Sequence, residues 1–207
     1  MTDFSLDELR PGLVRWTARH PAAVDEPEPG SPDDWPAEVG SVAYRAGDAL
    51  VLIDPLLPVD TDAPPWPQID ALAGECGGRV TVSTTVRFHG RSRDAVTERF
   101  GATTKLPAGV TPFKTRATGE TLLWIEEHRA LVPGDLLLGD APSGGKAAAG
   151  GIRLCPESWL YYLDGVTLDD VRADLRPLLD LPVEMVLVSH GEPLLSDGRA
   201  ALERALA

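Results

Sequence analysis

The chain has 207 residues, of which 43% are hydrophobic and 25% are charged, as expected for a soluble globular domain with a sizeable core. Its formal net charge of −13 argues against nucleic acid or an anionic membrane as a partner. A local basic patch could still bind a small-molecule anion. The sequence shows no apolar leader and no apolar run near the ~18–20 residues of a membrane span, so we expect a cytoplasmic protein. Its oligomeric state is left open.

The first quarter of the chain predicts three strands and one irregular loop. Residues 12–17 alternate apolar and polar side chains, as an edge strand does. A surface loop rich in Pro, Asp and Glu is predicted for about residues 20–38, with a solvated His20 at its start. Residues 41–55 predict a hairpin whose second strand is apolar until Asp54. Because this acid ends a buried strand, it needs polar partners.

The middle of the chain alternates helices and strands, which is typical of a layered α/β sheet. Helices are predicted over 68–76 and 91–100, and strands over 79–84 and 102–106. A second hairpin is predicted over 120–126 and 129–132, with a solvated His128 at its turn and Asp135 after its second strand. The Gly/Ala-rich run over 140–151 predicts a mobile loop above a site.

The C-terminal third predicts helices around one more buried strand. Thr167 is expected to cap an amphipathic helix that Pro177 ends, and Asp197 to cap the last helix. The other predicted elements are a short aromatic-rich helical segment over 156–162, a buried strand over 183–189 and the last helix over 197–206. Cys76 and Cys155 form no spaced motif and are expected to be buried free thiols.

Four strands that we expect to be buried lead into polar side chains, namely Asp54, His89, Asp135 and His190. Polar groups at strand ends on one edge of a sheet converge in space. Two imidazoles and a carboxylate can hold a divalent metal such as Zn²⁺, Fe²⁺ or Mn²⁺. A metal of this kind lowers the pKa of its bound water to about 7 and so supplies a nucleophile.

From about Val39 to its end, the sequence resembles the metallo-β-lactamase superfamily. The resemblance lies in five motifs in the family's order: VLIDPLLP, VTVSTTVRFHGRSRDAVTERFGA, TRATGETLLW, ALVPGDLLLGD and VEMVLVSHGEPLLSDG. It implies an αββα sandwich, an α/β (α+β) fold, as a single domain over 1–207 with a metal site between the two sheets. The first motif would supply Asp54 as the family's structural aspartate.

The resemblance also implies that most of the family's metal ligands have been lost. His89 falls on the last histidine of the H-x-H-x-D-H signature. Phe88 takes the place of the aspartate, and Thr84 and Val86 take the places of the first two histidines. Arg116 replaces the histidine expected in the middle of the chain. A two-metal enzyme is therefore not expected.

What remains of the implied ligand set is His89, Asp135 and His190. One interpretation is a one-metal hydrolase of an ester, thioester or phosphoester, in which Asp135 is catalytic and orients a metal-bound hydroxide. The alternative is a metal-free pseudoenzyme that binds or senses a ligand in the former active-site pocket. Arg116 favours the alternative, because a fixed cation there replaces part of the missing positive charge. A redox or other non-hydrolytic metal protein is a third interpretation.

The arginines around the signature have two interpretations. Arg116 and one of Arg87 or Arg91 form an anion cradle at the mouth of the pocket in the first. In the second, these residues and Arg93 are ordinary surface groups that balance an acidic protein.

Overall fold

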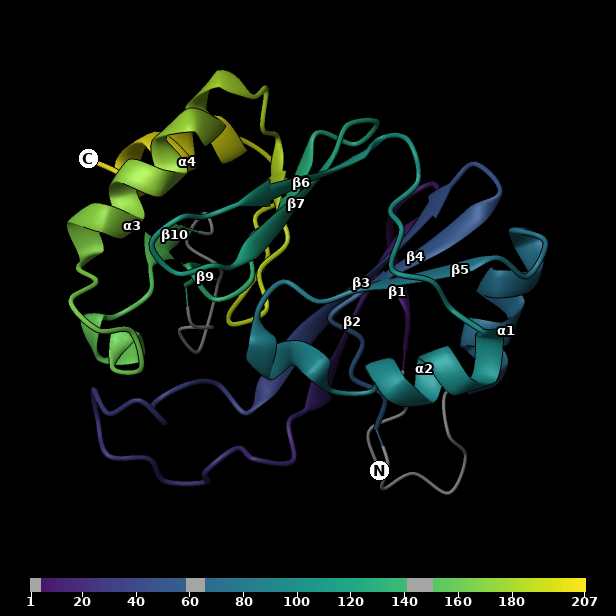
Figure 1. Ribbon diagram of the computed structural model, residues 1–207, viewed down its shortest axis with the longest axis horizontal. Coiled ribbons are helices and arrows are strands. Elements are labelled where there is room, and N and C mark those ends of the chain that lie inside the picture. The colour runs from purple at the N-terminus through teal and green to yellow at the C-terminus, as the bar shows by residue number, and fades with distance from the viewer. Residues whose placement is uncertain (1–4, 59–65, 141–150) are drawn as a thin grey trace.

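We describe a computed structural model of the chain, which covers residues 5–58, 66–140 and 151–207. Two sheets lie face to face, and helices cover the outer face of each (Figure 1). This is the αββα sandwich expected from the sequence. No helix in the described ranges is long and apolar enough to cross a membrane.

The first sheet has the strand order β1-β2-β3-β4-β5 and is antiparallel except for the parallel pair β4 and β5. Its strands are β1 (Asp7–Arg10), β2 (Leu13–Arg19), β3 (Glu38–Ala46), β4 (Ala49–Ile53) and β5 (Val80–Ser83). Helices α1 (Trp66–Glu75) and α2 (Arg93–Phe100) pack on its outer face. The hairpin and both helices follow the sequence pattern, while β1 was not predicted.

The second sheet has the strand order β11-β8-β7-β6. Its strands are β6 (Val110–Lys114), β7 (Thr121–Ile125), β8 (Ala130–Val132) and β11 (Met185–Val186). Its outer face is covered by helices α3 (Leu168–Leu175) and α4 (Gly198–Ala205). The remaining elements are β9 (Leu137–Gly139), β10 (Ile152–Leu154), and the short 3-10 helices η1 (Arg87–Gly90), η2 (Glu157–Leu160) and η3 (Arg176–Asp180).

Alternation along the central strands divides their side chains between the layers. Val51 and Ile53 of β4 face the second sheet, and Leu50 and Leu52 face α1 and α2. In β7, Leu123 and Ile125 face the first sheet, whereas Leu122 and Trp124 face α3 and α4. A strand buried on both faces reads as a continuous apolar run, and this explains the sequences ALVLI and TLLWI.

Two predicted strands are shorter in the structure than in the sequence pattern. Residues 102–106 make only an isolated bridge, from Thr103 to Thr81. The segment 183–189 pairs with β8 over Met185–Val186 alone. The chain then crosses to the first sheet, where Gly40 N donates to Ser189 O at 2.7 Å. This crossing ends the strand early and delivers His190 to the space between the sheets.

Three local predictions about side chains are settled by the structure. His128 is buried rather than solvated, because its ring packs edge-on against Tyr44 with centroids 5.4 Å apart. Asp197 precedes α4, but its side chain makes no capping hydrogen bond. Its backbone adopts a left-handed conformation that directs the side chain elsewhere.

Cys76 and Cys155 are buried and free, as expected. Most of the Gly/Ala-rich run, residues 141–150, lies outside the described residues.

Candidate metal centre and pocket

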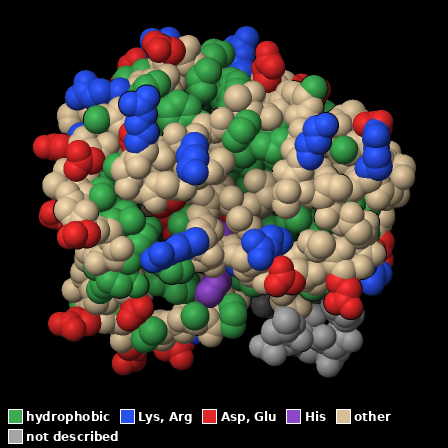
Figure 2. Space-filling view, in the orientation of Figure 1, with side chains coloured by type: hydrophobic (Ala, Val, Ile, Leu, Met, Phe, Trp, Pro, Cys, Tyr) green, Lys and Arg blue, Asp and Glu red, His purple; other side chains and the backbone are tan. Residues whose placement is uncertain are grey.

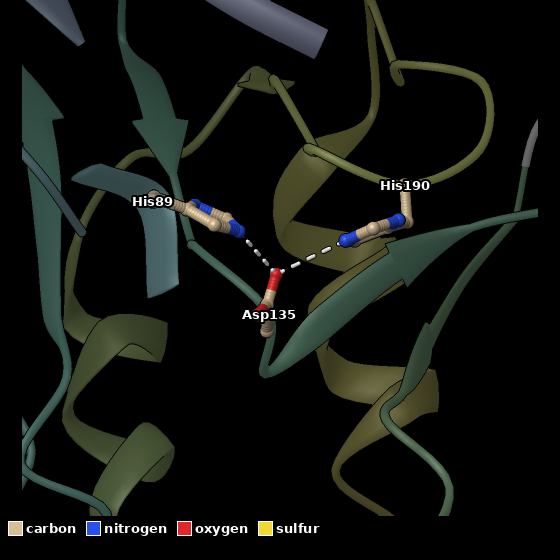
Figure 3. A group of neighbouring side chains, drawn as sticks. All are labelled: His89, Asp135 and His190. Carbon is tan, nitrogen blue, oxygen red and sulfur yellow. Dashed lines mark ion pairs between the residues drawn. The ribbon is translucent and has the colours of Figure 1, made fainter. Parts of the chain in front are cut away.

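Three side chains from distant parts of the chain meet at one end of the sandwich (Figure 3). His89 belongs to η1, Asp135 follows β8, and His190 follows β11. The Asp135 carboxylate lies between the two imidazoles, with Oδ1 3.0 Å from His89 Nε2 and 3.3 Å from His190 Nε2. One ligand atom from each residue lies within 4.8 Å of the others. The convergence expected from the strand ends is therefore present.

Asp54 is the fourth of these strand-end groups, and it fixes His89 from behind. Asp54 is 1% exposed, and its carboxylate accepts a hydrogen bond from Thr85 N at 2.7 Å and another from the Thr85 hydroxyl. The second oxygen is 2.8 Å from His89 Nδ1. A carboxylate partner on Nδ1 leaves Nε2 directed at Asp135, as in metal sites where a second carboxylate orients a ligating histidine.

Backbone packing fixes the position of His190. Gly139 N donates to His190 O at 2.9 Å, and His190 also bridges to Val39 of β3. Gly139 and Gly191 pass so closely that a Cβ on either would overlap the backbone of the other segment. The His190 ring lies between Trp35 and Trp159, which both meet it edge-on at centroid distances of 5.4 and 5.1 Å.

The charges in this cluster strongly influence one another. Burial lowers the pKa of His89, but Asp135 and Asp54 together raise it to about 9. Burial acts to raise the pKa of Asp135, and the two neighbouring imidazoles outweigh it and hold that pKa well below the usual range. Without a metal, His89 is therefore an imidazolium between two carboxylates.

The donor set fits a divalent metal. Asp135 Oδ1 is buried and has no aligned hydrogen bond within the described part of the chain, although both imidazoles lie close to it. Ligands bound to Zn²⁺ at about 2.0–2.2 Å in a tetrahedron lie about 3.4 Å apart, similar to the two short separations here. The orientation of the His190 ring is less firmly fixed by hydrogen bonds than that of His89. Its Nδ1 is buried and has no hydrogen-bond partner among the described residues.

Glu120 is part of this site, and the sequence analysis missed it. It directly precedes β7, is 3% exposed and accepts a hydrogen bond from Asp135 N at 3.2 Å. Burial, reinforced by the charge of Asp135, raises the pKa of Glu120 to about 8. The signal available in the sequence was an acid placed directly before the apolar run TLLWI. Thr85, which bonds Asp54, was also missed.

The former ligand positions hold no metal ligand. Thr84 is partly buried and Val86 is buried. Phe88 is 49% exposed and lines the pocket beside the cluster. Arg116 is exposed and is not among the pocket-lining residues in the described ranges. Its backbone N donates to Asp174 at 2.6 Å, and this contact draws the turn towards α3.

The three arginines of the hypothesised anion cradle therefore lie in different surroundings. Arg116 faces solvent away from the pocket. The Arg87 guanidinium lies 4.5 Å from the ring centroids of both Phe88 and Tyr162 and holds these two rings together. Arg91 lines the pocket itself. A cradle that includes Arg116 is not supported by this arrangement, because only one of the three arginines reaches the pocket wall.

A pocket of about 320 Å³ opens above the cluster. Figure 2 shows this face, where histidine reaches the surface between hydrophobic and basic side chains. One wall is the loop predicted over 20–38, and the other is the aromatic segment around η2. His20 is partly buried in the first wall, against the Trp35 ring at 5.3 Å, rather than solvated. Trp159 of η2 lines the second wall.

Solved structures share this fold. A metallo-β-lactamase from Erythrobacter litoralis matches 98% of this chain and 90% of its own, with a TM-score of 0.57 and 13% identity. A metallo-β-lactamase from the same organism, in its mono-zinc form, matches 98% and 94%, with a TM-score of 0.54 and 14% identity. A metallo-β-lactamase family protein from Thermus thermophilus matches 95% and 79%, with a TM-score of 0.52 and 16% identity.

The chain thus has the metallo-β-lactamase fold, as its motifs implied. No family model matches its sequence, and no curated protein does. At these identities the structural likeness defines the fold and leaves the activity to be argued from the site.

Proposed function

We propose that the protein is a one-metal hydrolase that binds a divalent ion at His89, Asp135 and His190. The observation that carries the proposal is the convergence of three ligand atoms within 4.8 Å, one of them a buried carboxylate oxygen without an aligned hydrogen bond. The mono-zinc structure from Erythrobacter litoralis supports it, because that protein has the same fold with a single zinc ion. The substrate would be a small ester, thioester or phosphoester, and the protein would be cytoplasmic.

The chain's own residues have separate roles in this proposal. Bound at the cluster, a divalent ion would polarise a carbonyl or phosphoryl oxygen and acidify a water molecule. Asp54 holds His89 in the tautomer that presents Nε2 to the site. Asp135 would orient the attacking water with its carboxylate. Glu120 holds the Asp135 backbone by accepting its amide hydrogen.

The metal-free pseudoenzyme is the second candidate, and one observation favours it. The imidazolium of His89 between Asp54 and Asp135 satisfies much of the charge in the cluster without any metal. In that state the pocket would bind a ligand without turning it over. Because the cation now comes from His89, this candidate no longer depends on Arg116.

Metal content and thermal stability distinguish the two candidates. For the hydrolase we expect about one equivalent of metal in untagged protein, and a melting temperature that falls when a chelator removes it. At metal concentrations about 100-fold above Kd, binding stabilises the folded state by roughly 2.7 kcal/mol.

The matched variants are His190→Gln, which removes a proposed ligand, and His128→Gln, which changes a buried histidine away from the cluster. Only the first should lose metal and the hydrolysis of para-nitrophenyl esters. Substoichiometric metal, together with a melting temperature that does not change when a chelator is added, would favour the metal-free pseudoenzyme.

A further inference from the structure

Arg91 occupies an unusual backbone position beside the proposed metal site. It directly follows η1 with φ 38° and ψ −120°. A positive φ of this kind favours glycine, and a long side chain there is strained. Strain of this kind persists where the surrounding structure imposes it, and such residues cluster at functional sites. The arginine side chain at this position therefore needs an explanation.

Structural hydrogen bonds account for only part of the guanidinium. Its NH1 group donates to Gly40 O and to Asp54 O, both at 3.0 Å. These two bonds fasten the η1 segment to the first sheet. Within the described ranges, neither Nε nor NH2 has a hydrogen-bond partner, and the side chain lines the pocket. Since a guanidinium keeps its charge at any physiological pH, the pocket wall carries a fixed cation.

The rest of the pocket is largely apolar and aromatic. Trp35 and Trp159 face it from opposite walls, and Phe88 and Tyr161 stand at 49% and 71% exposure along its lining. Large exposed aromatic side chains of this kind mark binding surfaces for apolar groups. A ligand that satisfies both features has an apolar body and one anionic group.

A carboxylate suits the arginine better than a phosphate does. With NH1 engaged and Nε buried, NH2 is the nitrogen of Arg91 left for a ligand, and it suits one carboxylate oxygen better than the several charged oxygens of a phosphate. Asp54 and Asp135 both act on its charge, so a dianion would meet more repulsion than a monoanion.

We propose that Arg91 is the specificity-determining residue of the pocket and binds a carboxylate of the substrate. The substrate is then an apolar or aromatic ester or thioester with a free carboxylate away from the scissile bond. The identity of the scissile bond rests on the proposed function, whereas carboxylate binding by Arg91 does not.

A pair of probes that differ in charge tests the proposal on chelator-treated protein. Phenylacetate and phenylacetamide have nearly the same shape, and calorimetry measures the binding of each. Phenylacetate should bind at least about tenfold more tightly, as expected for a charge-assisted hydrogen bond in a partly buried site. Arg91→Gln should abolish this preference, and Arg116→Gln, which changes an exposed arginine outside the pocket, should retain it.

Several outcomes would overturn the proposal. They are equal binding of the two probes to the wild-type protein, no binding of phenylacetate at millimolar concentration, and a preference that survives Arg91→Gln. If Arg91→Gln does not fold, Arg91→Gly replaces it, because glycine relieves the strained φ at this position. The first two outcomes are measured on the wild-type protein and need no variant.

Turnover by metal-loaded protein separates this proposal from the proposed function. The substrates are the para-nitrophenyl monoester of terephthalic acid and para-nitrophenyl benzoate, which lacks the second carboxylate; the rigid ring prevents the free carboxylate from attacking its own ester. Faster hydrolysis of the terephthalate by the wild-type protein, with this preference lost in Arg91→Gln, supports both proposals. Hydrolysis of neither, with the phenylacetate preference intact, contradicts the hydrolase and supports Arg91 as the carboxylate-binding residue.

Discussion

At the scale of single residues, the cluster shows how one histidine can serve two chemistries. His89 lies between Asp54 and Asp135, 2.8 and 3.0 Å away. With a metal present, Asp54 orients the ring and Nε2 is a ligand. Without one, the same ring is a buried cation whose single positive charge offsets part of the negative charge of the two acids.

The pH dependence of stability should separate two buried histidines. Burial lowers the pKa of His128 below its ordinary 6.5. The unfolded state then takes up the proton first, so stability is full above about pH 6.5 and falls as the pH drops below it. His89 has a raised pKa, so in metal-free protein its contribution is present below about pH 6.5 and is lost as the pH rises through about 9.

His128→Gln should therefore flatten the loss of stability between about pH 7 and pH 5. Urea unfolding at several pH values measures the slope. An unchanged slope in the variant would show that His128 does not titrate as its burial predicts.

Single residues were also where the sequence was least informative. Asp54, His89, Asp135 and His190 could be found because each follows a recognisable strand pattern. The roles of Thr85 and His20 could not be predicted, because they arise from neighbours that are distant in the sequence, and for Glu120 the only signal was its place directly before an apolar run. The motif that contains Arg116 predicted that this residue lies near the pocket. In the structure its backbone N–H donates to Asp174 of α3, and Arg116 lies outside the pocket lining.

At the scale of elements, local patterns predicted most of the helices and the long strands. The hairpin of β3 and β4, the strand β5 and the helices α1 to α4 all follow runs that periodicity identifies. Failures occur where tertiary pairing decides the outcome. The apolar run over 183–189 has the composition of a strand, yet it leaves its partner β8 to cross between the sheets.

The start of α3 offers a test of local stabilisation. The Thr167 hydroxyl accepts from Asp170 N, and the Asp170 carboxylate accepts from Thr167 N, which makes a capping box. Thr167→Ala should lower the free energy of unfolding by about 1 kcal/mol, because the backbone N–H of Asp170 loses its acceptor at the start of the helix. Thr167→Ser keeps the hydroxyl and should be close to wild type in the same urea titration. Equal losses in both variants would contradict a capping role.

At the scale of the whole molecule, the sandwich is held together by the layer between the two sheets. That layer joins Val42, Val51 and Ile53 of the first sheet to Leu123, Ile125 and Val132 of the second. The same two sheets support the site, because His89 comes from the end of the first and Asp135 from the second. Separation of the sheets would therefore remove the metal site and the pocket together.

A cavity in this layer should destabilise the entire fold. Leu123 is fully buried between the sheets, so Leu123→Ala removes packed volume that the rigid strands cannot refill. The expected loss is about 2–5 kcal/mol in the free energy of unfolding. Leu195 is 48% exposed, and Leu195→Ala is the matched control, with a change of about 0.5 kcal/mol or less. A local loss of metal at unchanged global stability would show that the two sheets unfold separately.

The close passage of Gly139 and Gly191 has a consequence for how such a site can evolve. The distance between β9, which begins two residues after Asp135, and the segment that carries His190 is set by two backbones in contact, and neither Gly139 nor Gly191 tolerates a side chain. Mutation can therefore exchange the ligands around this crossing one by one while the spacing of those that remain is inherited unchanged. A laboratory attempt to introduce histidines at positions 84 and 86 would start from a frame in which this backbone contact already fixes the spacing of Asp135 and His190.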